Sequence, residues 1–313
     1  MRPIFHFDGE NLAETWNKHI LPVRHDLAAN PLFSDEELAK LIEGNPQAIR
    51  EVSTMDPKSE DRNSWKRASF TDMSGMEILD AVRGGLLWIN VAEAGSFDPR
   101  YQAIIDTLLA DLAKQVPGLK TFQHRIGILI SSPNARVFYH CDIPGQGLMH
   151  VRGEKRIWIY PDGEPFLPQE ALERVVTGLS YEEIDYDPSF EKHATVIDLK
   201  PGMGALWPLN YPHRVINGDS LNVSFTVEYW TDEIRRHYLV NLANGVARHF
   251  LGVKPRSRAI SGPIFAMKAA FAAAWKLSGA KSYFSAKIKP DFEIRKQQKR
   301  QKELATEFKE AAE

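Results

Sequence analysis

The chain has 313 residues, and its 39 lysines and arginines nearly balance 41 aspartates and glutamates, which gives a formal net charge of −2. This balance excludes strong electrostatic capture of nucleic acid by the chain as a whole. The single cysteine excludes an intramolecular disulfide framework and any zinc or iron–sulfur site with several cysteines. The length and the 43% hydrophobic content allow one large decorated domain or two ordinary domains.

The first residues carry no apolar segment of the kind found in secretory signals. The most membrane-like stretch, Gly262 to Ala280, is interrupted by Lys268 and Lys276, which argues against a transmembrane helix. We therefore expect a cytoplasmic protein whose partners include neither a membrane nor nucleic acid.

Helical and irregular patterns dominate the first third of the chain. Residues 1–82 indicate mostly helical and irregular structure, with a helix start at Ser34 followed by acidic residues. Gly85 to Val91 predicts a buried strand, and Asp98 to Val116 has the apolar spacing of a helix. We assign residues 1–120 to an N-terminal helical region with a strand near 85–91.

The middle of the chain consists of short strand-like runs separated by glycine, proline and asparagine. These runs are Ile126–Ser131, Arg136–His140, Gln146–His150, Arg156–Tyr160, Ala194–Leu199, Gly204–Trp207 and Val223–Trp230. The pattern favours a β-sandwich or barrel over a βαβ fold. We assign residues 121–232 to this β core, with an acidic insertion at 162–192 that holds nine acidic and two basic residues.

Helical periodicity returns in the C-terminal third, residues 233–313. Ile234 to Phe250 and Ile264 to Leu277 have apolar residues at helical spacing, and a charged tail follows at 281–313. The second of these helices carries enough apolar residues for a dimer seam, so we expect a homodimer through residues 233–280.

A candidate metal site lies in the sequence His140-Cys141-Asp142. Side chains two positions apart on a strand share a face, so His140 and Asp142 point into one cavity and Cys141 points away as a small buried residue. An imidazole and a carboxylate suit an iron-type divalent metal, and a third ligand completes a facial triad with three open positions. The candidate for that ligand is His213, which opens a later strand.

Residues 126–230 resemble the double-stranded β-helix of the cupin-like Jumonji-C oxygenases, and are most similar to their factor-inhibiting-HIF type of asparaginyl hydroxylase. The family pattern is His-x-Asp, then a Gly-x-Lys turn, then a distal histidine. Here Gly153-Glu154-Lys155 places Lys155 thirteen residues after Asp142, and Pro212-His213 follows later. The resemblance implies a mainly β, cupin-like jelly-roll core with N-terminal helices and a C-terminal helical region.

The resemblance also implies an Fe(II)- and 2-oxoglutarate-dependent dioxygenase that uses O2 to hydroxylate an unactivated C–H bond and produces succinate and CO2. Demethylation is the alternative outcome where the carbon belongs to an N-methyl group. It assigns the iron to His140, Asp142 and His213, and the distal carboxylate of 2-oxoglutarate to Lys155. The charges agree, because a dicarboxylate that chelates a metal at one end needs a cation inside the barrel at the other. The prime substrate is expected to be a peptide or protein side chain or an amino-acid-like small molecule.

Three positions around the co-substrate depart from the family pattern, and one of them is Glu228, which stands where the asparaginyl hydroxylase has a neutral asparagine. Val137 stands three residues before His140, where members often have a threonine or serine hydroxyl. Trp88 is the nearest match to a tyrosine of the asparaginyl hydroxylase, and its ring nitrogen can only donate. We therefore expect a second polar side chain to bind the distal carboxylate together with Lys155. The candidates are Ser131, Ser132, Asn222 and Ser224.

Strand alternation after Asp142 places Gln146, Leu148 and His150 on the cavity side. We expect Gln146 to orient substrate or water and Leu148 to line the co-substrate site. For His150, a satisfied core histidine is favoured over a fourth polar group near the metal.

Two points stay open at this stage. The acidic insertion either receives a cationic group of the substrate or is a solvated surface loop, and the loop is favoured. The alternative function is a non-oxidative metal-binding cupin that acts as a sensor, an isomerase or a regulatory module, or as a scaffold for the C-terminal helices.

Overall fold

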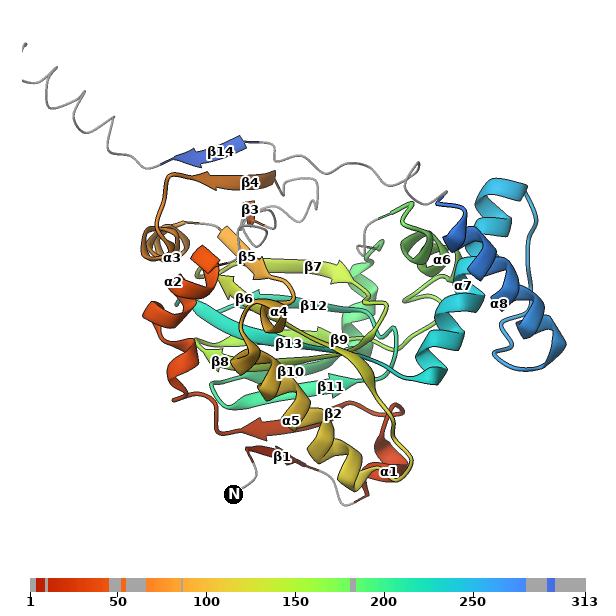
Figure 1. Cartoon of the computed structure of the whole chain (residues 1–313), viewed down its shortest axis with the longest axis horizontal. Helices are drawn as coiled ribbons and strands as arrows, with labels where there is room; N and C mark the ends of the chain where they lie inside the picture. Colours follow the sequence, from red (N-terminus) through yellow and green to blue (C-terminus); the bar gives the residue numbers. More distant parts are fainter. Residues whose placement is uncertain are drawn as a thin grey trace, which may run out of the picture.

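The centre of the computed structural model consists of two antiparallel sheets that enclose a shared interior, with helices on the outside (Figure 1). The structure describes residues 4–8, 11–44, 52–54, 66–85, 87–180, 184–279 and 292–295. Eight strands form the core: β6 (Phe122–Ser131), β7 (Arg136–His140), β8 (Gly145–Arg152), β9 (Lys155–Ile159), β10 (Thr195–Leu199), β11 (Met203–Trp207), β12 (His213–Asn217) and β13 (Asn222–Trp230).

The chain passes between the two sheets in the manner of a jelly roll. The larger sheet contains the segment β11-β8-β13-β6, and the smaller sheet has the order β10-β9-β12-β7. Successive core strands change sheet at each step except from β9 to β10, which pair with each other across the insertion. This topology confirms the predicted double-stranded β-helix with helical decorations.

The larger sheet continues beyond the core at both edges. Its further strands are β1 (Phe5–Phe7), β2 (Leu21–His25), β3 (Val52–Thr54), β4 (Lys66–Thr71), β5 (Leu87–Val91) and β14 (Phe292–Arg295). The prediction of mostly helical and irregular structure before residue 82 was therefore wrong for four strands. Two of them have only three residues, which is too short for an alternating pattern. The division at residues 120 and 232 stays a prediction, although the sheet itself includes strands from both sides of residue 120.

The helices cover the outside of the two sheets (Figure 1). They are α1 (Leu12–Thr15), η1 (Pro31–Phe33), α2 (Asp35–Gly44), α3 (Gly75–Gly84), α4 (Ala94–Phe97), α5 (Pro99–Gln115), α6 (Gln169–Thr177), η4 (Pro188–His193), α7 (Asp232–Leu251) and α8 (Gly262–Leu277). As the sequence indicates, α5 is capped by Asp98, whose side chain accepts a hydrogen bond from the backbone of Arg100. Within the described residues, every helix is too short or too polar to cross a bilayer.

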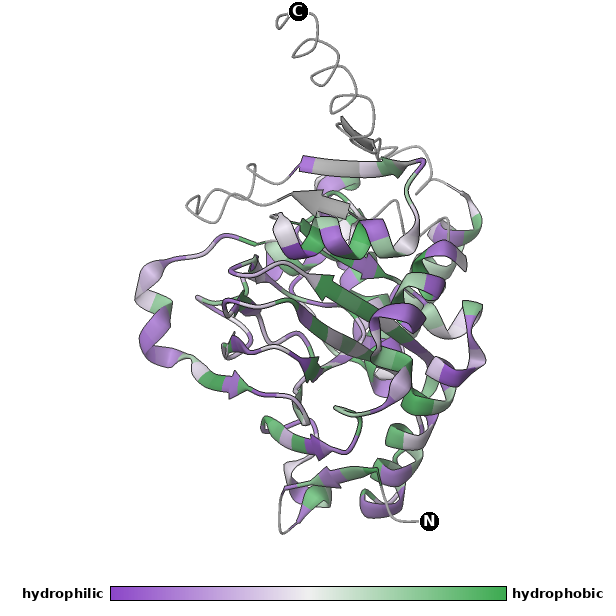
Figure 2. Ribbon diagram, turned by 90° about the vertical axis from the view of Figure 1, so that its left-hand side faces the viewer, coloured by the Kyte–Doolittle hydropathy of each residue, from purple (hydrophilic) through white to green (hydrophobic). Residues whose placement is uncertain are grey.

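Three apolar clusters hold these layers together. The largest joins the outer face of the larger sheet to α2, α3 and α5, and a second joins the outer face of the smaller sheet to α6 and α7. Cys141 lies in this second cluster, fully buried and facing away from the interior, as predicted. The third cluster fills the interior between the sheets. Figure 2 shows that hydrophobic residues concentrate on the central strands.

Candidate metal centre

His140, Asp142 and His213 meet at one end of the jelly-roll interior. His140 ends β7, Asp142 lies two residues further on, and His213 begins β12, the neighbour of β7. The strand register pairs His140 with His213, and their ring centroids are 4.1 Å apart. One ligand atom from each of the three residues lies within 4.8 Å of the other two. The structure therefore brings the proposed triad together.

Both imidazole rings are oriented by backbone carbonyls. His140 Nδ1–H donates to the carbonyl of Phe138 at 2.7 Å, and His213 Nδ1–H donates to the carbonyl of Tyr211 at 3.2 Å. Because a carbonyl can only accept, this assigns the proton to Nδ1 and leaves each Nε2 lone pair available to a metal. His213 Nε2 also lies 3.3 Å from Asp142 Oδ2. Two imidazoles and a carboxylate fit the donor set of a non-haem iron(II) site.

The environment of the triad shifts its protonation equilibria. Burial raises the pKa of Asp142, and the His140 ring and a hydrogen bond from the Gln146 side chain oppose this rise. Burial, together with His140, lowers the pKa of His213 well below its usual range. A divalent cation would stabilise the ionised carboxylate and bind the neutral imidazole, so these residues fit such an ion.

Two side chains outside the triad form hydrogen bonds with Asp142. Gln146, which we expected to orient substrate or water, is hydrogen-bonded to Asp142. Asn210 donates its side-chain N–H to the backbone carbonyl of Asp142 at 2.9 Å. Sequence reasoning missed Asn210, whose only sequence signal is its place in the Pro-rich turn before His213.

A buried cation lies on the same inner surface, further from the triad. Lys155 begins β9 with only 6% of its surface exposed, and burial lowers its pKa to about 7. In the register of β9 and β12, Lys155 pairs with Asn217, whereas His213 pairs with Ile159. This offset of four residues corresponds to about 13 Å along the strands. The interior is thus bounded by a metal-type triad at one end and an ammonium at the other.

The remaining predicted co-substrate residues lie around this interior. Leu148 belongs to the interior apolar cluster and is 5% exposed, and Val137 packs against the same cluster. Ser224 Oγ lies 2.9 Å from His150 Nδ1, so its hydroxyl is already engaged. Trp88 of β5 pairs in register with Ser131 of β6, next to the core strands.

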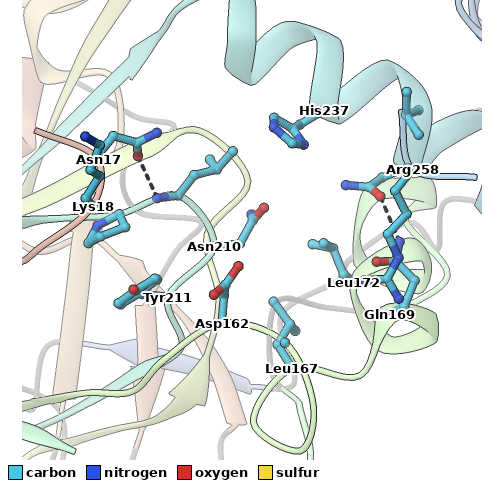
Figure 3. A pocket seen from close by; sticks show the side chains of 15 residues that line it. Asn17, Lys18, Asp162, Leu167, Gln169, Leu172, Asn210, Tyr211, His237 and Arg258 are labelled. Atoms are coloured by element: carbon cyan, nitrogen blue, oxygen red, sulfur yellow. Dashed lines mark hydrogen bonds between the residues drawn. The ribbon is translucent and has the colours of Figure 1, made fainter. Parts of the chain in front are cut away.

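A pocket of about 330 Å³ lies beside the turn that precedes His213 (Figure 3). Asn210 and Tyr211 line this pocket, and the same two residues hold the backbone of Asp142 and the ring of His213. On its other sides the pocket is lined by α6 and α7. Its lining includes charged side chains of both signs, which are Lys18, Asp162 and Arg258.

The acidic insertion does not present one uniformly acidic surface. Glu173 is fully buried and forms an ion pair with Arg248 at 2.6 Å. Glu191 forms an ion pair with Arg214, also at 2.6 Å. Glu182 and Glu183 lie outside the described residues. Asp162, which does reach the pocket, shares it with cations, so these contacts favour packing over recognition of a cationic substrate.

Comparison with known proteins gives distant structural likenesses. No protein-family model matches the chain, and no curated protein matches it in sequence. Among solved structures, YcfD of Escherichia coli has a TM-score of 0.48 at 15% identity, over 88% of this chain and 69% of that one. The E. coli ribosomal oxygenase YcfD in complex with cobalt and 2-oxoglutarate has a TM-score of 0.47 at 14% identity, over 92% and 74%. A cupin domain from Bordetella pertussis Tohama I has a TM-score of 0.23 at 11% identity, over 36% and 88%.

Proposed function

We propose that this chain is an Fe(II)- and 2-oxoglutarate-dependent oxygenase of the Jumonji-C type that hydroxylates an unactivated C–H bond. The observation that carries the proposal is the convergence of His140, Asp142 and His213, with both imidazole Nδ1 atoms bound to backbone carbonyls. Two imidazoles and one carboxylate leave three metal positions for a chelating keto acid and O2. The buried ammonium of Lys155 supports 2-oxoglutarate as that keto acid.

When bound, the Fe(II) ion with 2-oxoglutarate and O2 supplies the oxidising chemistry, which yields succinate, CO2 and a hydroxylated substrate. His140, Asp142 and His213 hold the ion, and Gln146 keeps the Asp142 carboxylate oriented. The interior apolar cluster, which includes Leu148 and Trp207, excludes water from the reacting groups. Lys155 orients the keto acid through its distal carboxylate.

The pocket beside the triad supports a peptide or protein side chain, or an amino-acid-like small molecule, as the prime substrate. Asn210 and Tyr211 connect this pocket to the triad. Its volume of about 330 Å³ lies within the range of small-ligand sites, which is roughly 300 to 1,000 Å³. The similarity to the asparaginyl hydroxylase type stays a prediction from the sequence motif.

The proposal can be tested with the full chain under anaerobic conditions. Addition of Fe(II) and then 2-oxoglutarate should produce a weak visible metal-to-ligand charge-transfer band, and admission of air should produce succinate. The variant His140→Ala should give neither. The variant His124→Ala is the matched control, because His124 is bonded to Asp106 and Thr121 outside the barrel. Iron-loaded wild-type protein with no band and no succinate would instead support the non-oxidative cupin.

A further inference from the structure

His150 has an unsatisfied polar atom in the interior of the jelly roll. It lies on β8 between Met203 of β11 and Ser224 of β13, and its side chain is fully buried. Its Nδ1 is 2.9 Å from Ser224 Oγ. Its Nε2 is buried without a hydrogen-bond partner. An unpaired buried donor costs about 1–3 kcal/mol, so this atom points to a partner that arrives from outside the chain.

The Lys155 ammonium affects the protonation of the His150 ring. The chain crosses from β8 to β9 in the two residues Gly153 and Glu154, so His150 and Lys155 flank one tight turn. Burial and the charge of Lys155 lower the pKa of His150 to about 3, whereas the Gly153 backbone, which faces the ring without a well-formed hydrogen bond to Nε2, raises it. The ring is therefore neutral at physiological pH. Within the described part of the chain, Lys155 forms no ion pair, so its charge is also available to an external anion.

Most of the other polar groups nearby are engaged or are acceptors. His25 Nε2 is also buried without a partner, but its ring packs against Phe225, which belongs to the outer apolar cluster. The side-chain N–H groups of Asn217 donate to Ser131 Oγ at 2.7 Å and to the Ser132 carbonyl at 2.9 Å. Asn222 Oδ1 has no partner, but an acceptor offers nothing to an anion. His150 Nε2 is thus the neutral group best suited to share an anion with Lys155.

We propose that His150 Nε2–H donates a hydrogen bond to the distal carboxylate of 2-oxoglutarate, beside the Lys155 ammonium. The proposal rests on the function proposed above and names a second binding residue of its co-substrate site. In this arrangement Ser224 is a positioning residue: its hydroxyl, 2.9 Å from Nδ1, would donate to that nitrogen and so keep the ring proton on Nε2. One cation and one neutral donor match the single charge of a carboxylate, which leaves no excess charge buried.

The test compares two five-carbon keto acids that differ only at the distal end. 2-Oxoglutarate has a distal carboxylate and 2-oxovalerate has a methyl group there. Their dissociation constants are measured by calorimetry on the full chain loaded with Mn(II), without O2 or prime substrate. His150→Leu keeps a similar volume without a donor and should weaken 2-oxoglutarate about 10- to 100-fold, the loss expected for a hydrogen bond to a charged group. It should leave 2-oxovalerate and Mn(II) affinity unchanged.

Two further variants separate a binding role from a packing role. His150→Gln retains a terminal N–H donor and should stay within about threefold of wild type, because the hydrogen bond is rescued. Ser224→Ala should weaken the binding of 2-oxoglutarate without changing that of 2-oxovalerate. This variant replaces His150→Leu in the test if His150→Leu does not fold.

The outcomes distinguish this inference from the proposed function. Wild-type affinity for 2-oxoglutarate in folded His150→Leu, or an equal loss for both keto acids, would show that His150 only packs in the core. If Lys155→Ala still weakens 2-oxoglutarate in that case, the proposed function survives and only the His150 assignment fails. If wild-type protein does not bind 2-oxoglutarate, both fail.

Discussion

His140 and His213 occupy paired positions on neighbouring strands, with ring centroids 4.1 Å apart, although they lie far apart in sequence. The jelly-roll topology causes this proximity, because β12 lies between β7 and β9 in the smaller sheet. The distance between the two proposed ligands is therefore fixed by strand pairing rather than by a mobile loop. A site of this kind is organised before the metal binds.

Removal of a triad residue should abolish metal binding. Wild-type protein should bind one Mn(II) or Fe(II) ion per chain, and Asp142→Ala and His213→Ala should bind none at the same metal concentration, because two ligands cannot complete the triad. Metal content after desalting measures this. His124→Ala, outside the triad, should retain the ion, and full occupancy in Asp142→Ala would contradict the assignment.

Loss of the hydrogen bond from Gln146 to Asp142 should weaken metal binding without abolishing it. Gln146→Leu removes the hydrogen bond to the Asp142 carboxylate and should raise the Mn(II) dissociation constant about 10- to 100-fold, as is typical for groups that orient a metal ligand. Competition with a metal-sensitive dye measures the constant. Gln102→Leu on α5 is the control, since Gln102 bonds to Asp106. An equal effect of both variants would indicate general destabilisation.

Binding of 2-oxoglutarate should weaken as the pH rises through about 7. Burial lowers the pKa of Lys155 from 10.5 to about 7 in the folded chain, so its charge is present below this pH and is lost above it. The dissociation constant measured across this range in metal-loaded protein should therefore increase with pH. Lys155→Arg should show a flatter profile, because arginine keeps its charge up to a pH of about 12. A rise of the same size in both proteins would exclude Lys155 as its cause.

The same pKa shift predicts a change in stability in the absence of ligand. An unfolded lysine keeps its proton up to about pH 10.4, whereas folded Lys155 loses it from about pH 7. Between these values the unfolded state binds more protons, so the free energy of unfolding should increase with pH. Lys155→Met should lack this component, which denaturant titrations at several pH values can measure.

The turn that joins His150 to Lys155 should depend on glycine. Gly153 has a φ of +80°, and a Cβ there would lie 2.6 Å from the Leu221 carbonyl oxygen. Gly163 has a similar φ of +75° but open space around its Cβ position. Gly163→Ala should cost about 1–2 kcal/mol, the usual penalty of a left-handed backbone, and Gly153→Ala should cost clearly more. Equal losses of unfolding free energy would show that the turn adapts without strain.

The exposed face of α8 leads us to expect a homodimer. Only Ala272 of this helix is buried, while Ile264, Met267 and Leu277 are 49, 65 and 88% exposed. A second copy would cover these side chains. Light scattering should give twice the chain mass, and Met267→Lys should lower it by placing a charge in the seam. A monomer mass at tens of micromolar would contradict the expectation.

The sequence by itself indicated most of the core strands and the three candidate metal ligands. Most core strands lie within one or two residues of the predicted runs, because turn residues mark their ends, whereas β6 begins four residues earlier and β12 is not among those runs. His140 and Asp142 were assigned to one cavity because alternate side chains of an extended segment share a face. Both signals are local, so they can be read without knowledge of the fold.

Tertiary structure alone decided which polar residues remain without a partner. Three-residue edge strands such as Phe5–Phe7 depend on a neighbouring strand for their hydrogen bonds, so their own sequence does not reveal them. Likewise, the sequence favoured a satisfied core histidine at position 150. Its hydrogen-bond partners come from neighbouring strands, and the sequence does not show which strands are neighbours. Only the pairing of β8 with β13 shows that one nitrogen of His150 lies within hydrogen-bond distance of Ser224, while the other is buried without a hydrogen-bond partner.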